Sequence, residues 1–161
     1  MTERTELERE PSSEIRVRMR DCDVHGHLHN TRYIDYVFDA RDDHLRAYYD
    51  FDMWEVARRT RLGWYVAMNQ ARFYEPARIG TLLRAVTRVI SYDQQRFSLE
   101  GRLYGENDRL SALVWSAFRA VDVQSGQPAE HSEELMALFA RVVLALPGEP
   151  TFEARARSVE R

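Results

Sequence analysis

The stretch "RDCDVHGHLHNTRYIDYVFDAR", residues 20–41, joins a strand-like pattern to a helical one, and this change sets the fold. Residues 15–20 alternate Ile, Val and Met with three arginines, a period of two that predicts a strand with one face in water. From about Asn30, apolar side chains recur at spacings of three and four, which predicts a long helix with a broad apolar face. Asn30 and Thr31 are suitable residues to cap its start, and Gly26 is placed to turn the chain before it.

The rest of the chain contains four strand-like runs with no helical pattern between them. They are residues 64–74, 81–90, 95–105 and 110–123. The first has apolar side chains in both alternating sets, which is typical of a central strand covered on both faces. Residues 48–63 before it are ambiguous between a short helix and a loop, and residues 129–146 have the pattern of a second amphipathic helix. This order of elements predicts an α+β domain in which an antiparallel meander wraps around the long helix.

Length and composition indicate one globular domain. The 161 residues are 44% hydrophobic and 30% charged, and they contain no apolar run of about 18 residues that could span a bilayer. The net charge of -3 provides no general attraction to nucleic acid or to a membrane surface. We expect a single domain over residues 14–146, between flexible polar tails over residues 1–13 and 147–161 that bury little.

The sequence also favours a cytoplasmic location. The N-terminal segment lacks the apolar middle of a signal peptide. Cys22 is the only cysteine, so no disulfide can form within the chain, which is compatible with a reducing compartment.

A metal site is one hypothesis for the polar residues of this stretch. All of the following are residue types that zinc accepts as ligands: Asp21, Cys22, Asp23, His25, His27 and His29. However, a row of histidines at every second position either alternates between faces around a turn or points along one strand edge. The chain also has no HExxH pair at helical spacing. A metal-dependent hydrolase is therefore the weaker interpretation.

A cysteine nucleophile activated by a histidine is a second hypothesis. Histidines lie close to Cys22 in the sequence, but catalytic partners of this kind normally meet only in the fold. A small buried or half-buried packing residue is the simpler interpretation of Cys22.

A catalytic carboxylate fits the local architecture best. The first turn of a helix has backbone N–H groups without partners and carries the positive end of the helix dipole. An aspartate a few residues before the helix start near Asn30 could face a carbonyl group whose oxygen binds those N–H groups. A carboxylate and an oxyanion hole are the minimum equipment for acyl transfer.

The same stretch resembles the signature of hotdog-fold thioesterases of the 4-hydroxybenzoyl-CoA thioesterase and acyl-carrier-protein thioesterase type. Their pattern is roughly D-x-D-x-x-G-H-v-n-N-x-x-Y-…-A-R, and the matching residues are Asp21, Asp23, Gly26, His27, Leu28, Asn30, Tyr33, Ala40 and Arg41. The stretch "QARFYEPARIG", residues 70–80, resembles a second family stretch, an aromatic residue followed by PAR-x-G. The similarity covers about residues 14–123. It implies a hotdog fold: a sheet of about five strands around one long helix, here with a C-terminal helix in addition.

The resemblance implies hydrolysis of an acyl or aroyl thioester of coenzyme A or acyl carrier protein to a free carboxylic acid. Asp23 falls on the carboxylate that acts in relatives as nucleophile or general base. The backbone amide near Asn30 falls where relatives bind the thioester oxygen, and His27 is expected to orient neighbouring groups. The leaving thiol of the thioester has a pKa near roughly 8.5, so it can leave without a dedicated general acid. The resemblance implies no metal or other cofactor.

Substrate contacts are expected around the motif and from one arginine. His25, Leu28, His29 and Tyr33 would surround the thioester, and His29 stands where many relatives have Asn. Arg61 belongs to a cluster of arginines before the second strand and could hold the phosphates of coenzyme A.

A hotdog unit on its own leaves one sheet edge uncovered, which is costly for a soluble chain. The resemblance therefore implies a homodimer with the two sheets joined edge to edge, or a homotetramer. An alternative function remains: a hotdog protein that binds or dehydrates acyl groups on a carrier without hydrolysing them.

Overall fold

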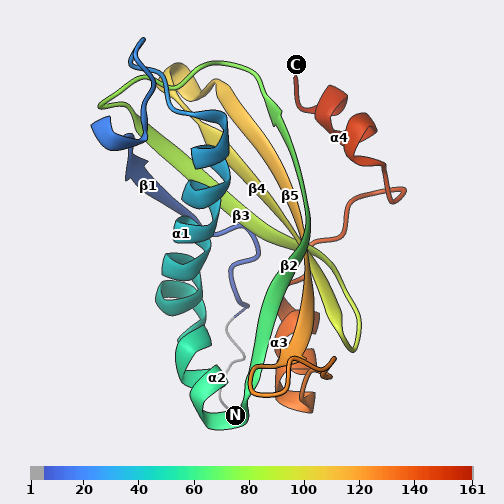
Figure 1. The fold of residues 1–161 in the computed structure, drawn as a ribbon. Coiled ribbons are helices and arrows are strands. Elements are labelled where there is room, and N and C mark those ends of the chain that lie inside the picture. The colour runs from blue at the N-terminus through green and yellow to red at the C-terminus, as the bar shows by residue number, and fades with distance from the viewer. Residues whose placement is uncertain (1–5, 161) are drawn as a thin grey trace.

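The computed structural model describes residues 6–160 of the chain. In these residues five strands form one antiparallel sheet, in the order β1-β3-β4-β5-β2, that curls around helix α1, Asn30–Tyr49 (Figure 1). The strands are β1 Ser12–Arg16, β2 Leu62–Phe73, β3 Leu82–Tyr92, β4 Arg96–Tyr104 and β5 Leu110–Asp122. The predicted α+β hotdog architecture is confirmed.

The shorter helices are α2 Met53–Thr60, α3 Glu133–Val142 and α4 Phe152–Ser158, and two 3-10 turns cover Met19–Asp21 and Glu106–Asp108. The ambiguous segment 48–63 contains α2, because the Asp52 side chain caps this helix by accepting hydrogen bonds from the amides of Trp54 and Glu55. The predicted C-terminal amphipathic helix corresponds to α3. None of the helices within residues 6–160 is long and apolar enough to cross a membrane.

The first strand lies earlier than the alternation over residues 15–20 predicts. β1 ends at Arg16, and the buried Val17 donates its N–H to the carbonyl of Thr81 at 2.9 Å as the chain leaves the sheet. Met19 then lies in a 3-10 turn and is 77% exposed. The prediction was wrong because an alternating pattern persists through a turn, where it no longer reports which face is buried.

Strand β2 is an edge strand, and its prediction as a central strand was wrong. It pairs with β5 only, and within residues 6–160 no strand pairs with its other side. Large apolar side chains along it are exposed, including Tyr65 at 47% and Met68 at 52%. The apolar composition of β2 does indicate side chains that need burial, but no strand within residues 6–160 buries this edge.

The core lies between α1 and the inner face of the sheet. Tyr33, Val37 and Ala40 of α1 pack against Leu99 and Leu103 of β4. Helix and strand approach closely at Gly101, where an added Cβ atom would lie 2.3 Å from Cγ1 of Val37. A side chain at this position would therefore push the helix off the sheet.

We expect Gly101→Ala to lower the free energy of unfolding by about 2 kcal/mol or more, since the β-branched Val37 has little rotamer freedom to move aside. Urea denaturation measures the effect. Gly63→Ala is the matched control, because its Cβ would meet Val123, which is exposed and can move. The double variant Gly101→Ala/Val37→Ala should be more stable, by at least about 1 kcal/mol, than the sum of the two single losses in the free energy of unfolding. Residues in contact are coupled by roughly this amount. Additive losses would contradict this explanation.

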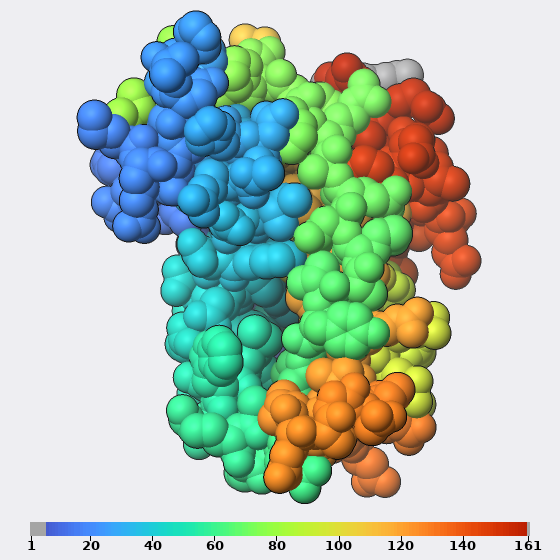
Figure 2. Space-filling model, viewed as in Figure 1, coloured from blue at the N-terminus to red at the C-terminus, as the bar shows by residue number. Residues whose placement is uncertain are grey.

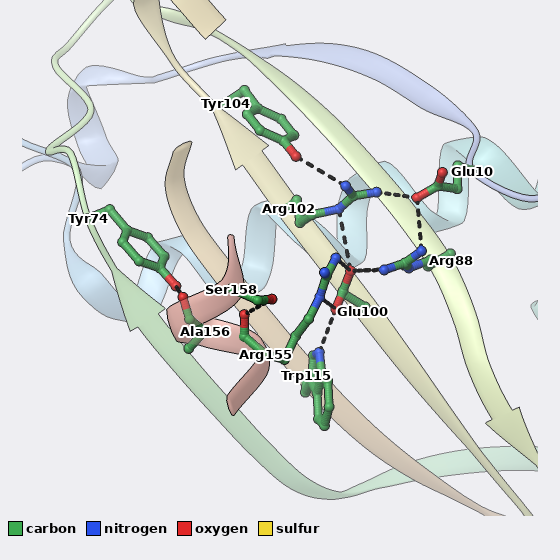
Figure 3. Close-up of polar contacts among 10 residues, drawn as sticks. All are labelled: Glu10, Tyr74, Arg88, Glu100, Arg102, Tyr104, Trp115, Arg155, Ala156 and Ser158. Atoms are coloured by element: carbon green, nitrogen blue, oxygen red, sulfur yellow. Dashed lines mark hydrogen bonds and ion pairs between the residues drawn. The ribbon is translucent and has the colours of Figure 1, made fainter. Parts of the chain in front are cut away.

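Residues 147–160 bury more than the sequence predicts. Helix α4 lies on the outer face of the sheet, opposite α1, with Ala156 buried and its carbonyl accepting from the Tyr74 hydroxyl at 2.8 Å (Figures 1 and 3). The Arg155 guanidinium donates two hydrogen bonds to the Glu100 carboxylate of β4, both at 2.9 Å. The prediction that residues 147–161 bury little was wrong for the described part of this segment. Arg155 neutralises the Glu100 carboxylate, which lies far away in the sequence.

The N-terminal segment also contacts the sheet. Leu7 packs against the cluster of Val89, Phe139 and Val142, Pro11 is fully buried, and the Glu10 carboxylate binds Arg102. Residues 1–5 of the predicted N-terminal tail lie outside the described residues.

His44 joins α1 to two strands. Its ring is buried, with Nδ1 2.8 Å from the Thr87 hydroxyl of β3 and Nε2 3.0 Å from the Ser13 hydroxyl of β1. Burial, and then the positive charge of Arg41, lowers the pKa of His44 to about 4 from the ordinary 6.5. Between these values the unfolded chain binds a proton that the folded chain does not. Stability is therefore complete above pH 6.5 and is lost as the pH falls towards 4.

We expect His44 to account for a loss of about 2 kcal/mol in the free energy of unfolding between pH 7.5 and pH 5. Urea denaturation at both values should show a pH dependence smaller by this amount in His44→Gln than in the wild type. His25→Gln, which changes an exposed histidine, should keep the wild-type difference. An unchanged pH dependence in His44→Gln would refute the assignment.

Candidate active site

The two stretches that the sequence analysis singled out lie side by side. Residues 17–29 connect β1 to α1 and are held against the segment after β2 by backbone hydrogen bonds. Leu28 donates to the carbonyl of Ala77 and Ile79 donates to the carbonyl of Gly26, both at 2.9 Å. The PAR-x-G stretch therefore forms the support on which the motif loop rests.

The centre of the loop is a tight turn organised by Asp23. Its Oδ1 atom accepts hydrogen bonds from the amides of His25 at 2.9 Å and His27 at 3.0 Å. The backbone of Asp23 pairs with the carbonyl of His27 at 2.8 Å and the amide of Gly26 at 3.0 Å. Gly26 has φ +74°, a conformation that side chains disfavour, which is why glycine stands at this position.

The hydrogen bonds to Asp23 also determine its ionisation. The amides of His27 and His25, together with the nearby imidazole rings, lower the pKa of Asp23 below its ordinary value. The group is therefore a carboxylate at neutral pH. Its Oδ2 atom makes no hydrogen bond to any residue within 6–160, so one carboxylate oxygen remains available.

The start of α1 is open. His29, not Asn30 or Thr31, occupies the N-cap position, and its side chain does not cap the helix. The predicted cap was wrong by one residue, because the amide of His29 is tied to the Asp21 carbonyl at 3.0 Å and the helix begins immediately after it. Asn30 and Thr31 are exposed residues, and their amides, the first two of the helix, have no acceptor in the described part of the chain. They can donate to an incoming oxygen atom.

The two aspartates of the motif have different environments. Asp21 is buried, accepts a hydrogen bond from the Tyr36 hydroxyl at 2.9 Å and lies 3.5 Å from the Arg32 guanidinium. Its role is structural, because it fixes the loop to α1. Tyr36 had no predicted role, although its position three residues after Tyr33 on the buried helix face was an available signal.

The remaining predicted residues divide into three groups. His25 and His29 are exposed near the loop, and His27 is half-buried with an Nε2 atom that has no hydrogen-bond partner in residues 6–160. Leu28 and Tyr33 are core residues, 3% and 2% exposed, and the Tyr33 hydroxyl accepts from the amide of Ala77 at 2.9 Å. Their burial argues against direct contact with a substrate.

Arg61 ends α2, and this helix lies at the opposite end of α1 from the motif loop (Figure 1). The Arg61 guanidinium binds the Asp122 carboxylate at 2.6 Å. The role of Arg61 in holding the phosphates of coenzyme A stays a prediction. Sequence spacing could not show that Asp122 neutralises this arginine.

The competing site hypotheses lose support. The Cys22 thiol donates to the carbonyl of Arg18 at 3.3 Å, and burial raises the pKa of Cys22, so the reactive thiolate is disfavoured. Within residues 6–160, no group of three or more His, Cys, Asp and Glu side chains is arranged to hold a metal ion. Of the three chemistries, the carboxylate hypothesis remains: an ionised Asp23 in the loop that leads into the open start of α1.

Comparison with known proteins agrees with this geometry. The probable thioesterase of Bartonella henselae is similar in structure, with a TM-score of 0.70, 21% identity, and 76% of this chain and 99% of that chain covered. The DHNA-CoA thioesterase of Staphylococcus aureus has a TM-score of 0.77 at 14% identity, covering 83% and 90%. A Staphylococcus aureus protein solved in complex with CoA has a TM-score of 0.74 at 12% identity, covering 89% and 92%. At these identities the likeness shows the fold.

The family is shown by the sequence itself. No curated protein sequence matches the chain. The profile of the thioesterase-like superfamily, however, matches residues 17–139, which include the motif loop, α1, the sheet from β2 to β5 and most of α3. The predicted enzyme class, thioester hydrolase, is thereby confirmed at the level of the family, and the chain belongs to the thioesterase-like superfamily of hotdog-fold proteins.

Proposed function

We propose that this protein hydrolyses acyl thioesters of coenzyme A, with Asp23 as the catalytic carboxylate. Two observations support the proposal: Asp23 is an ionised carboxylate with one free oxygen, and the loop that holds it leads into a helix start whose Asn30 and Thr31 amides are unoccupied. The thioester oxygen would accept hydrogen bonds from those amides as negative charge develops on it. Coenzyme A is chosen over a carrier protein because the similar structures include a CoA complex and an enzyme named for a CoA thioester.

The lowered pKa of Asp23 bears on its chemical role. The lowered pKa keeps Asp23 ionised at neutral pH, which both direct attack and removal of a proton from water require. In the direct route, the carboxylate attacks the thioester carbon. The attack expels the coenzyme A thiolate and forms a mixed anhydride, which water then hydrolyses to the acid and free Asp23.

A dimer would complete the site. The motif loop and the start of α1 are exposed in the single chain, and the β2 edge beside them is unpaired and apolar. Two copies joined through β2 would form a continuous ten-strand sheet, cover the β2 edge of each protomer and supply each site with a wall from the other protomer. Sedimentation should therefore show at least a dimer.

The proposed function is tested with a panel of acyl-CoA thioesters, by detecting the free thiol that hydrolysis releases. At least one should be hydrolysed with an acceleration of about a millionfold or more over the uncatalysed reaction. Tight binding of acyl-CoA with no release of thiol would overturn hydrolysis in favour of a binding protein.

A further inference from the structure

A second cleft lies on the outer face of the sheet, the face opposite α1. Its floor consists of residues from β2, β3, β4 and β5, and its wall is the chain that links α3 to α4 together with the first residues of α4. In Figure 2, β2 (green) lies between α1 (blue) and the C-terminal segment (red), so the sheet separates this cleft from the motif loop. The cleft is therefore distinct from the Asp23 site.

The outer-face cleft has the size and the lining of a small-molecule site. Its volume is about 860 Å³, and sites for small ligands commonly have volumes of about 300 to 1,000 Å³. Most of the residues that line it are apolar, and they include Met68, Ile90, Ala117, Val143 and Leu146. A ligand in this cleft would therefore have an apolar body.

Two aromatic rings meet at an angle in the cleft. The rings of Trp115 of β5 and Phe152 of α4 have centroids 5.5 Å apart and planes inclined by 71°. The Trp115 indole N–H donates to a Glu100 carboxylate oxygen at 2.8 Å, which fixes the orientation of the ring (Figure 3). Both residues are only half-buried. Ring faces attract cations, and groups of aromatic side chains are a common means of binding quaternary and methylated ammonium groups.

The charges in the cleft have one sign. Glu149 and Glu153 line it and are exposed, and within residues 6–160 neither carboxylate has an ion pair or a hydrogen bond. None of the described residues that line the cleft is arginine, lysine or histidine. The guanidinium of Arg155, two residues after Glu153, binds Glu100 instead. The cleft therefore attracts cations and repels anions such as coenzyme A.

The wall that carries the two glutamates is held in place by the fold. Arg155 anchors α4 to the buried Glu100 of β4 by two hydrogen bonds. Pro147 and Pro150 flank the turn before α4 and restrict its backbone. A preformed wall reduces the conformational entropy that is lost when a ligand binds.

We propose that the outer-face cleft binds an organic cation, in which an apolar body carries a quaternary or methylated ammonium group. The ammonium group contacts the rings of Trp115 and Phe152 and is attracted by Glu149 and Glu153, while the apolar body packs against the outer face of the sheet. The proposal does not depend on thioester hydrolysis, because the sheet separates the cleft from Asp23.

NMR titration of the full-length protein with three benzyl compounds tests the choice of a cation. Benzyltrimethylammonium should bind with a Kd of about 1 mM or lower. Neutral benzyl alcohol should bind at least about fivefold more weakly, because it lacks the cation–π and carboxylate contacts, and the phenylacetate anion should bind more weakly still. Equal binding of the three compounds, or no binding of the ammonium compound, would overturn the proposal.

Substitutions test the two parts of the ammonium site. Phe152→Leu keeps an apolar residue but removes one ring, and it should weaken binding of benzyltrimethylammonium at least about threefold. The double variant Glu149→Gln/Glu153→Gln should weaken it by a similar factor. Its matched control is Glu133→Gln/Glu134→Gln, which removes two exposed carboxylates at the start of α3, outside this cleft, and should change Kd less than about twofold. Equal losses in the two double variants would reduce the effect to general electrostatic attraction and contradict the proposal.

Blocking the cleft tests its location. Ala117→Phe adds bulk to the floor of the cleft and should abolish binding, whereas Ala140→Phe adds the same bulk on the exposed side of α3 and should leave Kd unchanged. Hydrogen exchange of the wild type locates the site without any substitution. Benzyltrimethylammonium should slow the exchange of amides in residues 143–153 and leave residues 20–30 unchanged. Slower exchange in residues 20–30 instead would place the cation beside Asp23, and no change in either segment would exclude the cleft as a site.

Discussion

Asp23→Asn is expected to lower kcat for the best CoA thioester at least about a hundredfold, with little change in KM. Asparagine is nearly the same size as aspartate, and its side-chain carbonyl can still accept the hydrogen bonds from the amides of His25 and His27. The loop therefore keeps its shape, and only the negative charge and the reactive oxygen are lost. Steady-state kinetics on wild type and variant, with circular dichroism to confirm folding, measures the effect.

The control for this prediction is Asp35→Asn, which removes another carboxylate near the start of α1. Asp35 is exposed and, within residues 6–160, its carboxylate binds only Arg32, at 2.8 Å, so kcat should stay within about twofold of the wild-type value. Equal losses in the two variants would indicate a general effect of charge near the helix. A fully active Asp23→Asn enzyme would exclude this carboxylate as nucleophile or base.

Glu100→Gln is expected to destabilise the fold by about 3 to 5 kcal/mol. Glu100 is fully buried, and its carboxylate accepts hydrogen bonds from Arg88, Arg155 and the Trp115 indole (Figure 3). Burial alone would raise the pKa of Glu100, but Arg155 and Arg88 outweigh it, so the pKa is lowered. Neutral glutamine would leave the arginines with too little negative charge around them.

Urea denaturation of Glu100→Gln at pH 7 provides the measurement. Glu75→Gln is the matched control, because its ion pair with Arg109 is exposed, and it should change the free energy of unfolding by less than about 1 kcal/mol. The lowered pKa also predicts that the stabilisation from Glu100 is complete above the ordinary glutamate pKa and is lost as the pH falls through and below it. A Glu100→Gln protein as stable as the wild type would show that the ion cluster contributes only to the placement of α4.

The sequence alone determined the features that depend on local periodicity and spacing. Spacings of three and four located α1 to within a residue of its observed start at Asn30, because the side chains of one helix face must be apolar to cover the sheet. The motif placed Asp23 on a turn before that helix, because glycine at position 26 and the amides after Asp23 supply the hydrogen bonds and the conformation of the turn itself. The α+β class followed from the order of these local patterns.

Only the tertiary structure decided which surfaces are covered and which charges are paired. The apolar composition of β2 is the same whether its cover comes from this chain or from a second copy, so the pattern could not distinguish a central strand from an edge strand. Arg155 and Glu100 are 55 residues apart, and Arg61 and Asp122 are 61 apart, so neither pair leaves a signal in local spacing. Burial and long-range electrostatics depend on which distant segments fold together, and that information is not contained in any short window of the chain.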